Sequence, residues 1–205
     1  MEILTMPVGP IGTNCYIVSD GDVCAIIDPG EEGRRLAYNI KSHEWEPKAI
    51  LLTHSHYDHT GGVEELRKVF PDLVVYRSEK DHYHDPRVLQ LYPELGPTTP
   101  CAEGDVITVG SLSFTVLETP GHTEGSVTFQ CEDCLFCGDT LFAGSCGRTD
   151  MFGGDQDKMW KSLRRLGRLP ETCKVYPGHM QDTTLARELK QNPYLQHALR
   201  GGDWF

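Results

Sequence analysis

The amino-acid sequence predicts a layered α/β fold in which two mixed β-sheets carry helices on their outer faces. Strand-like apolar segments outnumber helical ones, and the two kinds alternate along the chain in two halves. Turn signals such as the Asp-Pro-Gly at 28–30 follow several apolar runs directly, so polar residues collect at strand ends. Strands hold such loops rigidly, which makes these ends the expected place for a ligand site.

The expected strands are short apolar runs bounded by Gly, Pro, Asn or Asp. They fall at residues 2–6, 15–20, 23–28, 48–53 and 72–77 in the first half, and at 105–110, 112–119, 126–130, 134–139 and 173–178 in the second. Apolar residues with helical spacing occur at 31–43, 61–70, 155–169 and 183–192. No repeat or linker divides the sequence, so residues 1–205 are expected to form a single domain.

Composition narrows the classes of function. No stretch of the chain approaches the roughly 20 apolar residues that cross a bilayer, and the first residues lack the basic flank and apolar core of a secretory signal. We therefore expect a cytoplasmic protein without membrane contact, whose eight cysteines are reduced thiols. A net charge of −11 without a basic stripe argues against a nucleic-acid partner.

Residues 51–62, LLTHSHYDHTGG, place three histidines and an aspartate within six positions. His54 and His56 leave one extended segment on the same side, so both can reach one cation at about 2.0–2.1 Å. Asp58 and His59 follow where the chain turns into a helix, and they can face a second cation. Neither pair fills a four-coordinate shell, which predicts further His or Asp donors at other strand ends.

Three further donors occur in comparable settings: His122 in TPGHTEGS, Asp139 in LFCGDTLF and His179 in YPGHMQ. Asp139 is the expected bridge, because the two oxygens of one carboxylate can bind both cations and reduce their repulsion. Imidazole and carboxylate ligands suit zinc but also accept iron or manganese. Two divalent ions, with zinc as the first choice, are therefore the expected cofactors.

The pattern T-H-x-H-x-D-H, followed by separated His, Asp and His, resembles the ligand signature of the metallo-β-lactamase-fold hydrolases. The resemblance implies a four-layer αββα sandwich with two metal sites. One site would use His54, His56, His122 and Asp139, and the other Asp58, His59, Asp139 and His179. It also implies a hydroxide held by the metals near neutral pH and oriented by Asp58, which would act as the catalytic residue.

A narrower resemblance comes from residues 136–155, FCGDTLFAGSCGRTDMFGGD, and 188–195, ELKQNPYL. Both are similar to short bacterial hydroxyacylglutathione hydrolases of the glyoxalase II type. The resemblance implies a thioesterase that cleaves S-lactoylglutathione or a related hydroxyacyl thioester, with a small-molecule substrate as its partner. Only 26 residues follow His179, fewer than the helical C-terminal domain of larger glyoxalase II enzymes needs, which leaves the thiol carrier open.

Candidate substrate contacts come from two segments. In the larger enzymes a basic residue at the position of Arg148 holds the glycine carboxylate of glutathione; an internal ion pair with Asp150 or Asp155 is the alternative. Residues 77–100 are polar, aromatic and proline-containing, and are a candidate for a flap over the site. Tyr83 and Tyr92 in this flap are candidates for substrate contact or for packing.

Two other patterns imitate metal sites. His82 and His84 repeat the H-x-H spacing, but a charged flap accounts for them without a second centre. The cysteines at 131, 134 and 137 have C-x2-C-x2-C spacing, yet no fourth ligand accompanies them, and a hairpin that turns at 132–133 is the preferred interpretation. Cys146 lies in the expected site loop, although hydrolysis does not require its thiol.

Rival functions remain open at this point. A persulfide dioxygenase of the same fold shares the seven positions and the CGRTD-like loop, but uses a single iron held by His54, His122 and Asp139. A β-lactamase is disfavoured by the expected location and by Asp139, where many lactamases have cysteine. A nuclease would need a basic surface or an added substrate-binding module, and the sequence indicates neither. A non-enzymatic metal-binding protein would not need an open coordination position, so a complete ligand set beside Arg148 argues against this class.

Overall fold

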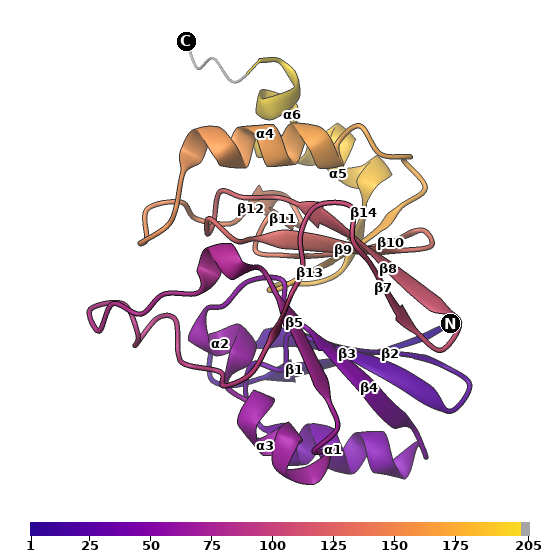
Figure 1. Cartoon of the computed structure of the whole chain (residues 1–205). Coiled ribbons are helices and arrows are strands. Elements are labelled where there is room, and N and C mark those ends of the chain that lie inside the picture. The colour runs from indigo at the N-terminus through magenta and orange to yellow at the C-terminus, as the bar shows by residue number, and fades with distance from the viewer. Residues whose placement is uncertain (202–205) are drawn as a thin grey trace.

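The computed structural model describes residues 1–201, and its sheets and helices form layers. Two six-stranded sheets lie face to face. Helices α1 (Gly33–Ser42) and α3 (Val63–Val69) cover the outer face of the first sheet, and α4 (Gln156–Leu166), α5 (Leu185–Gln191) and α6 (Pro193–Leu199) cover that of the second (Figure 1). The predicted four-layer αββα sandwich is therefore confirmed. That residues 1–205 form one domain stays a prediction.

The first sheet contains the N-terminal strands in chain order. These are β1 (Glu2–Val8), β2 (Thr13–Asp20), β3 (Val23–Ile27), β4 (Glu46–Leu51), β5 (Val74–Arg77) and β6 (Thr99–Pro100). Strands β1 to β3 pair antiparallel, whereas β3 to β6 pair parallel. Parallel neighbours need a crossover, which α1 supplies between β3 and β4 and α3 between β4 and β5. The short helix α2 (Tyr57–Thr60) precedes α3.

The second sheet has the order β14 (Thr183–Thr184), β13 (Lys174–Pro177), β10 (Cys134–Gly138), β9 (Val127–Cys131), β8 (Leu112–Glu118) and β7 (Val106–Val109). Its pairs are antiparallel except for β10 and β13, which run parallel and are connected through α4. Strands β11 (Leu141–Phe142) and β12 (Ser145–Cys146) form a small hairpin beside it. The predicted hairpin at 132–133 is confirmed, because Cys131 pairs with Cys134.

Apolar burial holds the layers together. The cluster between the sheets includes Tyr16, Phe114, Phe129 and Phe136, all at most 2% exposed. Separate clusters lie between each sheet and its helices. Burying aromatic side chains of this size contributes roughly 1.5–3 kcal/mol each, so the inner cluster fixes how the strand ends of one sheet meet those of the other.

Two helical segments differ from expectation. The helix predicted at 61–70 is present as α3, which begins at Val63, and the one-turn helix α2 that precedes Gly61 and Gly62 was not predicted. Helix α6 was not predicted, although Asn192 and Pro193 are a recognisable start signal: the Asn192 side chain accepts hydrogen bonds from the backbone N–H groups of Tyr194 and Leu195. Within residues 1–201, no helix combines the length and apolar character needed to span a membrane.

Candidate metal centre

The seven predicted ligands lie together at one edge of the sandwich, where loops of both sheets meet. The segment His54–His59 follows β4, His122 lies between β8 and β9, and Asp139 and His179 directly follow the parallel strands β10 and β13. Backbone hydrogen bonds join these loops: Val127 donates to Thr53 across the two sheets, and Gly178 donates to Gly138. The side chains are therefore held at strand ends of both halves.

One group of donors consists of His54, His56 and His122, whose ligand atoms lie within 4.8 Å of one another. Nε2 of His122 is 3.0 Å from Nδ1 of His56. Asp139 approaches the same group, because its Oδ2 is 3.4 Å from Nε2 of His122. These four residues are the set that the sequence predicts for the first ion.

A second group consists of Asp58, His59 and His179, with the same maximum spacing. Oδ2 of Asp58 lies 3.3 Å from Nε2 of His59 and 3.2 Å from Nε2 of His179. Asp139 reaches this group as well, since its Oδ1 is 3.4 Å from Nε2 of His59. The carboxylate of Asp139 thus lies between the two groups, as a bridging ligand would.

Unpaired polar atoms show that the centre fits cations. Nε2 of His54, Nε2 of His59 and Oδ1 of Asp139 are buried and have no hydrogen-bond partner among residues 1–201. Buried polar atoms are almost always satisfied in folded proteins. Lone pairs of nitrogen and carboxylate oxygen that converge in this way are what divalent ions such as zinc, iron or manganese require.

The pKa shifts of His54, His56 and Asp58 favour metal binding, whereas for His179 burial is outweighed by Asp58 and Asp139, which raise its pKa. Burial and the neighbouring imidazoles hold the pKa of His54 well below its usual range, and burial lowers the pKa of His56 to about 3. Burial opposes ionisation of Asp58, but the adjacent His179 and His59 rings and the hydrogen bond from Thr13 outweigh it and depress the pKa of this carboxyl. Neutral imidazoles and ionised carboxylates are the forms that bind metals.

Asp28 contacts the ring nitrogen of His59 that points away from the other donors, and it was not among the residues predicted from the sequence. Its Oδ2 lies 2.9 Å from Nδ1 of His59 and accepts a hydrogen bond of 2.6 Å from the hydroxyl of Thr53. The second oxygen, Oδ1, accepts from the backbone N–H of Thr53. Burial lowers the pKa of His59, but Asp139 and Asp28 reverse this effect and raise it. The Asp-Pro-Gly turn was the available signal, but it reads as an ordinary turn.

Asp81, in the 3₁₀ helix η1 (Glu79–Asp81), was also missed. This buried carboxylate accepts hydrogen bonds from the backbone N–H of Ser55, the hydroxyl of Thr123 and the backbone N–H of Gly125. Ser55 lies between two of the predicted ligands, and Thr123 follows His122. Asp81 therefore ties the loop of the first sheet to the loop of the second.

Close packing beneath the centre explains one glycine. A Cβ atom on Gly178 would lie 2.3 Å from Oδ1 of Asp139 and 2.6 Å from Cε1 of His59. No side chain fits in that space without displacing a predicted ligand. Glycine immediately before His179 thus lets the chain pass directly behind both groups of donors.

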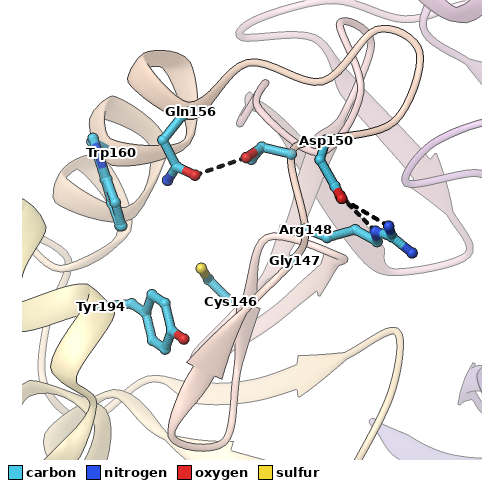
Figure 2. Close-up of a pocket in the computed structure, with 8 residues that line it drawn as sticks. Cys146, Gly147, Arg148, Asp150, Gln156, Trp160 and Tyr194 are labelled. Atoms are coloured by element: carbon cyan, nitrogen blue, oxygen red, sulfur yellow. Dashed lines mark hydrogen bonds and ion pairs between the residues drawn. The ribbon is translucent and has the colours of Figure 1, made fainter.

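A cavity of about 520 Å³ opens over the centre. Its walls include His56, Asp58, His122, Asp139 and His179, together with the apolar side chains of Ile11, Leu91, Phe142, Met151 and Met180. A neighbouring cavity of about 590 Å³ shares Cys146 and Arg148 with it and is bounded by Trp160 and Tyr194 (Figure 2). Donor atoms and apolar surface therefore face the same space, which is typical of small-molecule sites.

The predicted substrate contacts differ in their placement. Figure 2 shows Arg148 turned toward Asp150, to which its Nε and Nη2 donate hydrogen bonds of 2.7 and 2.9 Å; this is the internal pair considered above. Tyr92 is buried, its hydroxyl donates to the carbonyl of Phe152, and its ring packs 4.8 Å from that of His56. Tyr83 packs against Tyr92 and Phe152. This arrangement gives both tyrosines a packing role within segment 77–100.

Facing mixed sheets with two groups of His and Asp donors at their shared edge define a metal-binding protein of the αββα class. The sequence profile of the metallo-beta-lactamase superfamily matches residues 8–179. The chain belongs to that superfamily.

Relatives and solved structures agree with this family. The chain is 38% identical to the probable metallo-hydrolase YqgX of Bacillus subtilis, covering 95% of this chain and 98% of YqgX. It is 40% identical to a hydroxyacylglutathione hydrolase of Klebsiella pneumoniae over 87% of this chain, but spans only 66% of that enzyme.

Three structures are informative neighbours. BLEG-1, described as a B3 metallo-beta-lactamase, has a TM-score of 0.85 at 36% identity, covering 95% of this chain and 99% of BLEG-1. TTHA1623 in a di-iron-bound form has a TM-score of 0.81 at 38% identity, with coverages of 93% and 99%. ETHE1 from Myxococcus xanthus has a TM-score of 0.82 at 27% identity, with coverages of 100% and 92%.

Proposed function

We propose that this protein is a metal-dependent thioester hydrolase of the glyoxalase II type, which cleaves S-lactoylglutathione or a related hydroxyacyl thioester in the cytoplasm. The observation that carries the proposal is the cavity in which both groups of predicted ligands, apolar side chains and Arg148 face one another. The identity of about 40% to a hydroxyacylglutathione hydrolase supports it.

In this proposal His54, His56, His122 and Asp139 hold one ion, and Asp58, His59, Asp139 and His179 hold the other. Bound zinc, or iron or manganese in its place, lowers the pKa of a water ligand toward about 7 and polarises a carbonyl oxygen. Asp58 orients the attacking water, because its Oδ2 is fixed by a 2.9 Å hydrogen bond from the hydroxyl of Thr13 and its side chain is still 13% exposed. No serine or cysteine nucleophile is required.

Arg148 is the proposed anchor for a carboxylate on the thiol part of the substrate. Its ion pair with Asp150 is exposed, with side chains 63% and 70% accessible. Exposed ion pairs are worth about 0–1 kcal/mol, so a substrate carboxylate can replace Asp150 at little cost. The guanidinium would then offer the same two parallel N–H groups to the substrate.

Persulfide dioxygenation is the second candidate. ETHE1 is a dioxygenase, and the similarity to it covers the whole chain, which favours this candidate at the level of fold. It would need one iron, held by His54, His122 and Asp139, and would leave the second group without a catalytic role. The pairing of Asp58 with both His59 and His179 favours the binuclear alternative.

The deciding experiment compares substrates on one preparation whose metal content has been measured. Hydrolysis of S-lactoylglutathione is followed beside oxygen uptake with glutathione persulfide, and a cephalosporin tests the activity for which BLEG-1 is named. We expect thioester cleavage that is abolished in Asp58→Ala. Oxygen uptake without thioester cleavage would establish the dioxygenase instead, and metal-replete protein inert toward all three would support a non-enzymatic metal-binding role.

A further inference from the structure

The histidine pair of the flap has a geometry that its sequence alone did not show. Tyr83 points inward, where its ring packs 4.6 Å from that of Tyr92 and 5.2 Å from that of Phe152. The backbone at His82 is extended, and successive side chains of an extended segment point to opposite sides, so His82 and His84 are expected on the other side. Their ring centroids are 4.4 Å apart.

A carboxylate from the far end of the flap joins this pair. Oε1 of Glu94 lies 3.5 Å from Nδ1 of His84, and Oε2 of Glu79 lies 3.5 Å from Nδ1 of His82. Ligand atoms of His82, His84 and Glu94 all lie within 4.8 Å of one another, the same spacing as that of His54, His56 and His122. Within residues 1–201, neither glutamate forms an ion pair with lysine or arginine.

We propose that His82, His84 and Glu94 form a third divalent-cation site, which takes zinc-like ions and fastens the two ends of the flap together. Two imidazoles and a carboxylate are a donor set that zinc accepts, with water or Glu79 in the fourth position. An ion held there closes the segment between His84 and Glu94 into a loop and so reduces its conformational freedom.

Fastening this loop would act on the cavity over the main centre. The loop contains Leu91, which lines that cavity and whose carbonyl accepts a hydrogen bond from the backbone N–H of Tyr57. It also contains Tyr92, whose ring lies against His56. The third ion would thus order one wall of the cavity without touching the predicted ligands, and this role does not depend on which substrate the main centre takes.

The test uses protein already loaded at the main centre and dialysed against low-micromolar free Zn²⁺. We expect wild-type protein to retain one more zinc per chain than His84→Ala. Removing even a ligand's hydrogen-bond partner lowers metal affinity by about tenfold. Loss of the ligand His84 should therefore lower the zinc affinity at least as much, and Glu94→Gln should have a similar effect. The control is His43→Ala, an exposed histidine that stacks on Trp45 away from the flap, and it should match wild type.

A second readout follows the flap itself. The side chain of Arg87 is 87% exposed within the loop, so trypsin can cut after it. Added Zn²⁺ should slow this cut in wild type and in His43→Ala but not in His84→Ala, while thioester activity of His84→Ala without added zinc stays at the wild-type level. Equal zinc uptake by wild type and His84→Ala overturns the site. Extra uptake without protection at Arg87 overturns its fastening role.

Discussion

Oδ2 of Asp28 lies 2.9 Å from Nδ1 of His59 and so fixes which nitrogen of that ring faces the metal centre. Nδ1 donates to the carboxylate, and Nε2 is the nitrogen directed toward Asp58 and Asp139. Outer partners of this kind hold a ligand in the correct tautomer and increase its basicity.

Asp28→Asn is therefore expected to weaken metal binding while the fold is kept. The amide oxygen can still accept from His59, but the negative charge is lost and the amide NH2 cannot accept from the backbone N–H of Thr53. We expect affinity for one of the two ions to fall by about 10- to 100-fold. Competition with a chromophoric chelator measures this change. Asp22→Asn, an exposed aspartate, is the control, and equal affinities in the two variants would show that Asp28 does not act on the centre.

Asp139→Ala should disturb both ions, because the two oxygens of this carboxylate approach different donor groups. Metal analysis should show less than one tightly held ion per chain, and most of the thioester activity should disappear. A variant that keeps two ions and the full rate would mean that Asp139 is not the bridge.

Asp81→Ala should loosen the connection between the loops of His56 and His122. Three donors lose their buried acceptor, and unsatisfied buried groups cost about 1–3 kcal/mol each. We expect a clear loss of thermal stability together with weaker binding of the first ion, whereas Asp72→Ala on the surface changes neither. Lower stability with unchanged metal affinity would assign Asp81 to the fold alone.

Arg148→Ala should raise KM rather than lower kcat. The loss of a bidentate pair with a substrate carboxylate should raise KM for S-lactoylglutathione by about tenfold, and a thioester without a carboxylate should be little affected. Asp150→Ala is the matched variant, since it releases Arg148 from its internal partner. An equal rise of KM for both substrates in Arg148→Ala would contradict a carboxylate anchor.

Cys146 should react with iodoacetamide only at high pH. Burial raises the pKa of its thiol to about 11, so about one molecule in a thousand is thiolate at pH 8, and this fraction grows about tenfold per pH unit until the pKa is reached. Peptide mapping by mass spectrometry measures the rate of modification at Cys146. Rapid labelling at pH 7 would show an activated thiol, which the proposed hydrolysis does not use.

Residues whose role follows from local spacing could be predicted from the sequence, whereas residues whose role depends on distant partners could not. His54 to His59 could be recognised because spacing along one segment already directs their side chains. The carboxylates of Asp28 and Asp81 could not, because their importance comes from donors that are distant in the chain, such as Thr53 for one and Thr123 for the other. Likewise, alternating segments indicated two sheets, but not that β13 pairs with β10.

Each donor group contains residues from loops of both sheets, so neither group is complete until both halves of the chain have been synthesised and folded. The first half of the chain presents His54, His56, Asp58 and His59 early, but each group still lacks donors until the second half has been synthesised. Neither proposed ion site is complete before residue 179 has left the ribosome and β13 has paired with β10. On the proposed ligand assignment, metal acquisition is therefore a late event, and a nascent chain offers only an incomplete cluster of donors until then.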